Sequence, residues 1–489
     1  MIRFDKLSYA YKDGGGVRGI NLTIHKGELV VLTGKSGCGK TTIIRLINGL
    51  AYHFYEGRYE GGLTIDGKET TDGRNNAGNR DTADDRNAAD KRDAADMPLW
   101  ETGRRVGSVF QNPRDGFFAK YAEGEVAFAC ENYGFPRDEI RRRVEDAIET
   151  LHIAHLRDKK LKNLSGGEKQ KIAIASVYAA GPDIYVFDEP SSNLDTVSTA
   201  TLGGILETLK KQGATIIVAE HRINYLSGLA DRFVYLEEGE IKKIFSRREL
   251  FEADRADLAD MGLRDRDFCA PCIQKREEPG PARVTLELAG LAAAYRKKKV
   301  FEGFSIRLRS GDILAVTGTN GAGKTSLCRI LCGLQKPAAG EIRFNGKKIS
   351  PSGRMRRSYY VMNGPDNQLF AMSVYEELLL GLHDSPENRS RAECFLVDFG
   401  LAELAGLHPL RLSGGQKQRL TLAVAMMRDR ELIILDEPTS GLDLVNMELV
   451  AKAVKTAADQ GRIIIIVSHD TEFINRTCNC GIELCRPLY

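Results

Sequence analysis

The sequence lacks any long apolar run. Its 489 residues are 42% hydrophobic and 28% charged, but no stretch approaches the roughly 18 apolar residues that span a membrane as a helix. Residues 1–6 carry charges and no signal-peptide core. The net charge, 70 basic against 67 acidic residues or +3, is too small to indicate binding to nucleic acid or anionic lipid. These absences predict a cytosolic protein, which works at a membrane only if other chains supply the span.

A regular cysteine framework is also missing. The ten cysteines are scattered, and structural disulfides are not expected in a reducing compartment. One alternative stays open, because Cys269 and Cys272 could form half of a zinc site with Cys478 and Cys480 as the other half. The other interpretation is unpaired thiols in a linker and a tail.

A glycine-rich turn at 34–41 organises the chain. It joins an apolar run at 29–32 to a helix-like run at 42–47, which is the context of a P-loop. The glycines let backbone N–H groups point at phosphate oxygens, and the positive end of the helix adds to that attraction. Lys40 is expected to reach the outer phosphates and Thr41 to hold Mg²⁺. The pattern recurs at 318–325. The residues expected to bind nucleotide in these turns are Gly34, Lys35, Ser36, Gly37, Cys38, Gly39, Lys40, Thr41 and Thr42, with Gly318, Thr319, Asn320, Gly321, Ala322, Gly323, Lys324, Thr325 and Ser326.

Further motifs repeat in the same order in both halves. Tyr11 and Tyr295 each lie 23 positions before a P-loop, where a flat ring could stack on adenine; the alternative is a buried strand tyrosine. Leu-Ser-Gly-Gly occurs at 164–167 and at 412–415, before a helix-like run, and predicts a second anion-facing helix end in each half. The residues expected there are Ser165, Gly166, Gly167 and Glu168, and Ser413, Gly414, Gly415 and Gln416.

Acidic residues end a buried apolar strand in each half. Asp188 and Glu189 follow the first such strand, and Asp436 and Glu437 the second. The carboxyl end of a parallel strand is where open α/β sheets place their ligands. One more strand leads to His221 or His469, which we interpret as phosphate sensors. Gln111 in the first half corresponds to Asn363 in the second.

The halves differ in the length before the Leu-Ser-Gly-Gly motif. The P-loops are 284 positions apart and the Leu-Ser-Gly-Gly motifs 248, so the first half carries 36 extra residues. Most fall within about 70–97, which is rich in Asp, Arg, Asn and Ala and is expected to be a mobile surface loop. Residues 138–153 have the spacing of a helix with one buried stripe. The expected organisation is domain 1 at 1–245, a flexible linker at 246–282 and domain 2 at 283–489.

The order of these motifs, present twice, resembles ATP-binding cassette (ABC) ATPases over nearly the whole chain. The segments at 109–113 and 365–370 resemble the energy-coupling factor (ECF) or cobalt-type branch. The resemblance implies an α/β fold with two P-loop NTPase domains, each a mixed-sheet core with a helical subdomain. It implies an intramolecular head-to-tail pair of cassettes, with ATP between the P-loop of one and the Leu-Ser-Gly-Gly of the other. It also implies an integral-membrane T component, contacted near Gln111, and a substrate-binding S component.

Residue roles follow from the same resemblance. Asp188 and Asp436 are expected to bind Mg²⁺ through water, with Thr41, Thr325 and Gln111 as further ligands, while Glu189 and Glu437 orient or deprotonate the attacking water. His221, His469, Gln111 and Asn363 complete the catalytic set. Asparagine is shorter than glutamine by about 1.5 Å, and a shift near 1 Å costs on the order of 100-fold in a positioned site. The second site is therefore predicted to hydrolyse ATP more slowly, and Glu168, which replaces the usual glutamine, adds negative charge near it.

The function expected from these motifs is ATP hydrolysis that energises an importer, of ECF type, for a vitamin or metal ion. The chain would lie peripherally on the cytoplasmic face of the membrane and would bind no nucleic acid. Two alternatives remain. A sugar-type tandem importer ATPase has a similar length but fits the Gln111 neighbourhood less well. A translation-associated tandem ATPase would have a long helical connector and a basic extension, and neither is found here.

Overall fold

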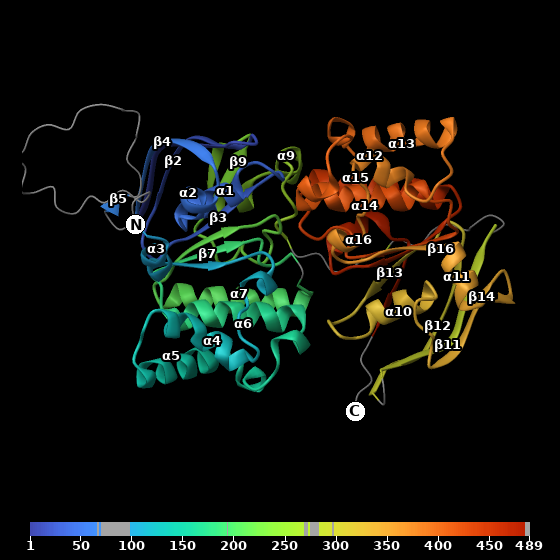
Figure 1. The fold of residues 1–489 in the computed structure, drawn as a ribbon, viewed down its shortest axis with the longest axis horizontal. Coiled ribbons are helices and arrows are strands. Elements are labelled where there is room, and N and C mark those ends of the chain that lie inside the picture. Colours follow the sequence, from blue (N-terminus) through green and yellow to red (C-terminus); the bar gives the residue numbers. More distant parts are fainter. Residues whose placement is uncertain are drawn as a thin grey trace, which may run out of the picture. The chain divides into compact units, whose positions relative to one another are not determined.

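The computed structural model describes residues 1–65, 68–69, 98–192, 194–267, 272–273, 283–295 and 298–484. The chain divides into two compact units, Met1–Phe268 and Cys269–Tyr489. Both contain sheets flanked by helices (Figure 1). The insertion expected at 70–97 lies outside the described residues. Within the described residues, no helix has both the length and the apolar character needed to cross a membrane.

The first unit has two sheets. One is antiparallel, in the order β2-β1-β4-β5, and the other is mixed, in the order β10-β9-β3-β8-β7-β6. The strands of the first unit are β1 (Ile2–Tyr11), β2 (Gly16–Ile24), β3 (Leu29–Gly34), β4 (Gly57–Ile65), β5 (Lys68–Glu69), β6 (Val106–Val109), β7 (Ile184–Asp188), β8 (Thr215–Ala219), β9 (Arg232–Glu237) and β10 (Glu240–Ser246). Its α-helices are α1 (Lys40–Ile47), α2 (Leu50–Phe54), α3 (Leu99–Arg105), α4 (Ala122–Asn132), α5 (Arg137–Thr150), α6 (Gly166–Ala180), α7 (Thr196–Lys211), α8 (Arg247–Glu252) and α9 (Arg255–Asp260).

The mixed sheet is buried on both faces. Leu29 and Val31 of β3 belong to the core shared with α4 to α7, whereas Val30 and Leu32 belong to the core shared with α1 and the antiparallel sheet. Because successive side chains of a strand point to opposite faces, an uninterrupted apolar run fits a strand covered on both sides. The parallel pairing of β3 with β8, and of β8 with β7, brings the ends of these strands together.

A helical subdomain lies between Gln111 and Ser165, as predicted. Helices α4 and α5 pack on each other and on α6. Helix α5 begins at Arg137, one residue before the predicted start, and buries Val144, Ala147 and Ile148. The predicted apolar stripe is therefore the face that α5 turns to the core.

The second unit repeats the plan. Its antiparallel sheet has the order β12-β11-β14-β15, and its parallel sheet has the order β16-β17-β18-β13-β19. The strands are β11 (Thr285–Tyr295), β12 (Lys298–Arg309), β13 (Ile313–Thr317), β14 (Ala339–Phe344), β15 (Lys347–Lys348), β16 (Ser358–Val361), β17 (Leu432–Asp436), β18 (Ile463–Val467) and β19 (Cys480–Glu483). The α-helices are α10 (Lys324–Leu331), α11 (Pro351–Arg357), α12 (Val374–Leu379), α13 (Pro386–Asp398), α14 (Gly414–Met427), α15 (Leu444–Asp459) and α16 (Thr471–Thr477). The expected fold class, two α/β domains with helical subdomains, is confirmed.

The segment expected to be a flexible linker, 246–282, differs in its first part. Residues 247–260 form α8 and α9, and Leu250, Leu258 and Leu263 are buried in the core of the first unit. The high charge of this segment favoured a connector, but its few leucines are spaced so that two short helices bury them. The first compact unit therefore extends beyond the expected boundary at 245.

Candidate nucleotide-binding sites

Each P-loop holds a buried lysine against backbone carbonyls. Lys40 is 4% exposed, and its Nζ donates to the carbonyls of Gly34 (2.9 Å) and Lys35 (3.1 Å). Lys324 is 8% exposed and donates in the same way to Gly318 (2.5 Å) and Thr319 (3.2 Å). In the described part of the chain, no carboxylate forms an ion pair with Lys40. A buried cation without an acidic partner suits an anionic ligand.

The tight P-loop turns depend on glycine. Gly39 and Gly323, the N-caps of α1 and α10, have φ of 104° and 103°. A Cβ atom at Gly39 would lie 2.6 Å from Val17 Cγ1, and one at Gly323 would lie 2.5 Å from Val300 Cγ1. Both the left-handed backbone and the close approach exclude a side chain. The glycine spacing that identified the motif thus has a steric cause in each unit.

A hydroxyl and a carboxylate meet where each P-loop ends. Thr41 Oγ1 donates to Asp188 Oδ1 at 3.1 Å, and Thr325 Oγ1 donates to Asp436 Oδ2 at 3.3 Å. Burial, together with the nearby Glu189 carboxylate, raises the pKa of Asp188 to about 6. Burial also raises the pKa of Asp436. A buried carboxylate beside a hydroxyl is an oxygen donor set that Mg²⁺ prefers, so these residues fit the expected cation.

In the first unit, the catalytic candidates converge on Glu189. Gln111 Nε2 donates to Glu189 Oε2 at 2.7 Å, and His221 Nε2 lies 3.3 Å from Glu189 Oε1. Glu189 has φ of 44°, in the left-handed region that non-glycine residues seldom occupy. Its backbone N–H is held by the carbonyl of Ala219 at 2.8 Å. A constrained backbone therefore aims this carboxylate at the glutamine and the histidine.

In the second unit, Glu437 has the same backbone conformation as Glu189, but the surrounding side chains make different contacts. Glu437 has φ of 52°, and its N–H donates to the Val467 carbonyl at 2.8 Å. The Asn363 amide has no hydrogen-bond partner among the described residues. His469 Nε2 lies 2.9 Å from Lys324 Nζ and 3.7 Å from Glu437 Oε1. Since an ammonium can only donate, Nε2 of His469 accepts in this arrangement.

A buried carboxylate also fixes the loop after each acidic pair, and sequence reasoning missed it. Glu220, 2% exposed, accepts from Ser191 Oγ (2.7 Å), Tyr225 OH (3.0 Å) and the N–H of His221 (2.8 Å). In the second unit the acid is Asp470, 4% exposed, which accepts from Thr439 Oγ1 at 2.7 Å. The acid precedes the histidine in one unit and follows it in the other. Acidic residues beside the paired histidines were the available signal.

The Leu-Ser-Gly-Gly motifs cap the helices that follow them. Ser165 and Glu168 form a capping box on α6, and Ser413 and Gln416 form one on α14. Lys159 Nζ lies 2.9 Å from Glu168 Oε1. Burial would raise the pKa of Glu168, but hydrogen bonds from Ser165 and Lys159 outweigh it and lower that pKa to about 2. The charge that Glu168 was expected to add is therefore offset by Lys159, which weakens that argument for a slower second site.

A second buried acid ties the segment after Gln111 or Asn363 to the helical subdomain. Glu125 of α4 accepts from the N–H groups of Phe118 (2.9 Å) and Ala119 (2.7 Å). Glu377 of α12 accepts from Phe370 and Ala371, both at 2.7 Å. Movement of the helical subdomain would thus be passed to this loop.

Base stacking by Tyr11 and Tyr295 and zinc binding by the four cysteines stay predictions. Tyr11 packs edge-on against Tyr9 and Tyr55, with ring centroids 4.9 and 5.7 Å away, and its hydroxyl accepts from Arg45 Nη1 at 3.4 Å. The side chain of Tyr295 and all of Cys269 lie outside the description. Among the residues that the structure describes, no group of three or more His, Cys, Asp or Glu is placed to hold a metal.

Comparison with known proteins extends the motif argument. The family model described as "ABC transporter" matches residues 17–192 and 301–440. A Treponema denticola protein named "Putative ABC transporter ATP-binding protein" is 40% identical over 486 residues, covering 98% of this chain and 94% of its own. A Bacillus subtilis protein named "Putative HMP/thiamine import ATP-binding protein YkoD" is 28% identical over 505 residues, covering 97% and 88%.

Two solved structures share the fold. The "Model of ribosome-bound archaeal Pelota and ABCE1" matches with a TM-score of 0.67 and 20% identity, covering 97% of this chain and 76% of the other. The "RNase-L Inhibitor" matches with a TM-score of 0.62 and 20% identity, covering 97% and 87%. At this identity the likeness concerns the fold alone. The paired P-loops, the carboxylates at the strand ends and the family match lead to one conclusion: the chain belongs to the ABC transporter family, as a tandem of two cassettes that bind ATP with Mg²⁺ and hydrolyse it.

Proposed function

We propose that this chain is the ATPase subunit of an ABC importer of the energy-coupling factor type. It works at the cytoplasmic face of a membrane, beside an integral-membrane T component and an S component that binds a vitamin or a metal ion. The name of the B. subtilis relative, an HMP/thiamine import ATP-binding protein, supports the direction and the class of substrate. The match spans 97% of this chain, so both cassettes take part in it.

Within each site, the roles we infer follow the geometry. Lys40 and Lys324, with their glycine-rich turns, bind the phosphates. Thr41 with Asp188, and Thr325 with Asp436, hold Mg²⁺, whose charge stabilises the phosphates during transfer. The carboxylates of Glu189 and Glu437 orient the attacking water. We also propose that Ser165 to Glu168 and Ser413 to Gln416 bind phosphate at the ends of the helices that they begin.

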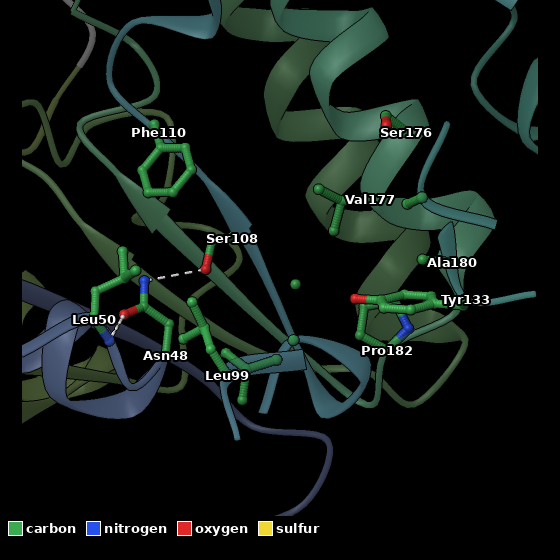
Figure 2. Close-up of a pocket in the computed structure, with 14 residues that line it drawn as sticks. Asn48, Leu50, Leu99, Ser108, Phe110, Tyr133, Ser176, Val177, Ala180 and Pro182 are labelled. Atoms are coloured by element: carbon green, nitrogen blue, oxygen red, sulfur yellow. Dashed lines mark hydrogen bonds between the residues drawn. The ribbon is translucent and has the colours of Figure 1, made fainter. Parts of the chain in front are cut away.

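The observation that carries the proposal is an apolar pocket of about 230 Å³ in the first unit. Leu50 and Leu99 line one side, and Val177 of α6 and Tyr133 line the other, as Figure 2 shows. Phe110, next to Gln111, also lines it and is 43% exposed. Apolar pockets of this kind accept apolar side chains of a partner helix. A short helix of the T component seated here would touch both the helical subdomain and the strand that leads to Gln111.

The test is a charge placed in the pocket. Leu99 is the first residue of α3, where a carboxylate is compatible with the helix dipole, so Leu99→Glu is expected to fold. Co-expressed with its genomic neighbours, the wild-type chain should fractionate with membranes and co-purify with a polytopic protein. Leu99→Glu should lower that recovery at least about tenfold, as expected for a charge buried in an apolar contact. The ATPase activity of the isolated chain should not change.

The matched control is Val397→Glu, which places the same charge on a side chain that is 69% exposed on α13. It should leave membrane recovery unchanged. A wild-type chain that never fractionates with membranes would overturn the proposal. Co-sedimentation with ribosomes in place of membranes would favour the translation-associated alternative.

A further inference from the structure

Tyr360 contacts the carboxylate that the second P-loop presents. It lies on β16, and its hydroxyl donates to Asp436 Oδ2 at 2.8 Å. Thr325 Oγ1 donates to the same oxygen at 3.3 Å. Asp436 is 5% exposed, and Tyr360 packs against the core of the second unit. Two hydroxyls from two different elements therefore fix the orientation of this carboxylate, while no hydrogen bond in the described residues uses its other oxygen.

Among the described residues of the first unit, no side chain on β6 makes the matching contact with Asp188, although the backbone register is the same. Ser108 pairs with Val186 on β7, as Tyr360 pairs with Ile434 on β17. Each aspartate lies two residues further along its strand, on the same face. The Ser108 side chain is too short to reach Asp188, and its hydroxyl accepts from Asn48 Nδ2 at 3.1 Å. Among the described residues, the Asp188 side chain receives one hydrogen bond, from Thr41.

The positions around this contact change together. Asn48 follows the first P-loop, and Cys332 stands at the matching place after the second, 284 positions later. In the first unit, the amide of Asn48 donates a hydrogen bond to the hydroxyl of Ser108. In the second unit a buried thiol leaves the phenol of Tyr360 directed at Asp436. The difference between the sites is thus a matched pair of side chains on a common backbone.

We propose that Tyr360 is a positioning residue that fixes Asp436 in the orientation required for Mg²⁺, so that nucleotide binding at the second P-loop depends more strongly on the cation than binding at the first. Hydrogen bonds to a ligating carboxylate orient it, and their loss typically weakens metal affinity 10- to 100-fold. Asp436 enters binding already oriented, whereas Asp188 must lose freedom when the cation arrives. Tyr360 acts through Asp436 and does not itself touch the nucleotide.

The experiment isolates the second P-loop within the full chain. Lys40→Ala removes the phosphate-binding lysine of the first site, so that a fluorescent ATP analogue reports the second. In this background, Tyr360→Phe should raise the Kd measured with Mg²⁺ about tenfold and leave the Kd measured in EDTA unchanged. The Mn²⁺ bound together with the analogue, measured by electron paramagnetic resonance, should fall by the same factor. Equal changes with Mg²⁺ and in EDTA, or no change in either, would overturn the proposal.

Two further variants test whether the effect is specific to the tyrosine of the second unit. Ser108→Ala in a Lys324→Ala background makes the matched deletion in the first unit. It should leave unchanged the ratio of the Kd in EDTA to the Kd with Mg²⁺. The converse double variant, Asn48→Cys with Ser108→Tyr in the same background, should increase that ratio. If it does not, the tyrosine is not what sets the dependence on the cation. Phenylalanine retains the ring of Tyr360, and thermal unfolding checks that the fold is kept.

Discussion

In the first cassette, Glu189 receives the amide of Gln111 and lies beside His221; in the second, Asn363 reaches no partner among the described residues and His469 contacts Lys324. The backbones match, down to the left-handed φ of Glu189 and Glu437. The two sites therefore differ in side-chain length and pairing on one shared scaffold. Substitutions that exchange these side chains should move one site toward the other.

The largest expected effect comes from removing the carboxylate beside the attacking water. Glu189→Gln should lower the steady-state ATPase rate by on the order of 1,000-fold, within the range for loss of a positioned base. Glu437→Gln should lower it far less, because the second site is proposed to contribute little turnover. Phosphate release measured at saturating Mg-ATP distinguishes the two. Equal losses from both variants would contradict the asymmetry.

Exchanging Gln111 and Asn363 tests whether the length of the amide side chain causes the difference in hydrolysis rate between the two sites. Gln111→Asn shortens the side chain that contacts Glu189 and should lower turnover at the first site by on the order of 100-fold. Asn363→Gln in a Glu189→Gln background should raise the residual rate. Single-turnover assays report the chemical step. A residual rate that Asn363→Gln leaves unchanged would show that amide length is not what separates the sites.

The two buried acids, Glu220 and Asp470, should contribute different amounts to the free energy of unfolding. Glu220→Ala leaves Ser191, Tyr225 and the N–H of His221 without their acceptor and should cost about 2 kcal/mol of unfolding free energy. Asp470→Ala removes the acceptor of Thr439 Oγ1 and the N-cap of α16, which accepts from the Phe473 N–H, but it leaves no tyrosine hydroxyl unpaired and should cost less, about 1 kcal/mol. Urea denaturation, followed separately for each unit, measures both. The reverse order would mean that Asp470 supports more than its contacts indicate.

The smallest expected effect concerns the ion pair between Lys159 and Glu168 in the first cassette. The pKa of Glu168 is lowered to about 2, so its contribution to stability is full above the unfolded value near 4.5 and is lost as pH falls toward 2. Glu168→Gln should therefore cost about 1 kcal/mol or less at pH 7 and less at pH 3.

The matched change in the second cassette is Gln416→Glu. The second cassette has no lysine at the position that corresponds to Lys159, where it has Leu407. Gln416→Glu should therefore change the free energy of unfolding little at pH 7, and adding Leu407→Lys to this variant should increase its stability. Denaturant midpoints at the two pH values test both variants. A Glu168→Gln cost that does not change with pH would exclude the ion pair as its source.

Sequence reasoning predicted the elements that depend on local pattern. The glycine turns, the apolar strands that end in acids, and the stripe on α5 all follow from periodicity and steric rules that act over a few residues. The charged segment at 247–260 was misinterpreted as a connector because composition does not reveal that Leu250 and Leu258 are buried in the core of the first unit. Glu220, Asp470 and Tyr360 were missed for a related reason, since each has a side-chain partner 29 or more positions away, namely Ser191, Thr439 and Asp436.

By itself, the sequence determined that this chain carries two nucleotide-binding halves and which side chains end their central strands, because repeated motifs at matched spacing leave few other interpretations. Only the tertiary structure decided which of those side chains meet. Whether Gln111 reaches Glu189, whether Lys159 neutralises Glu168, and whether Tyr360 contacts Asp436 depend on strand register and side-chain length across neighbouring elements. These are distances of a few ångströms between residues that can lie more than 70 positions apart, and no local pattern encodes them.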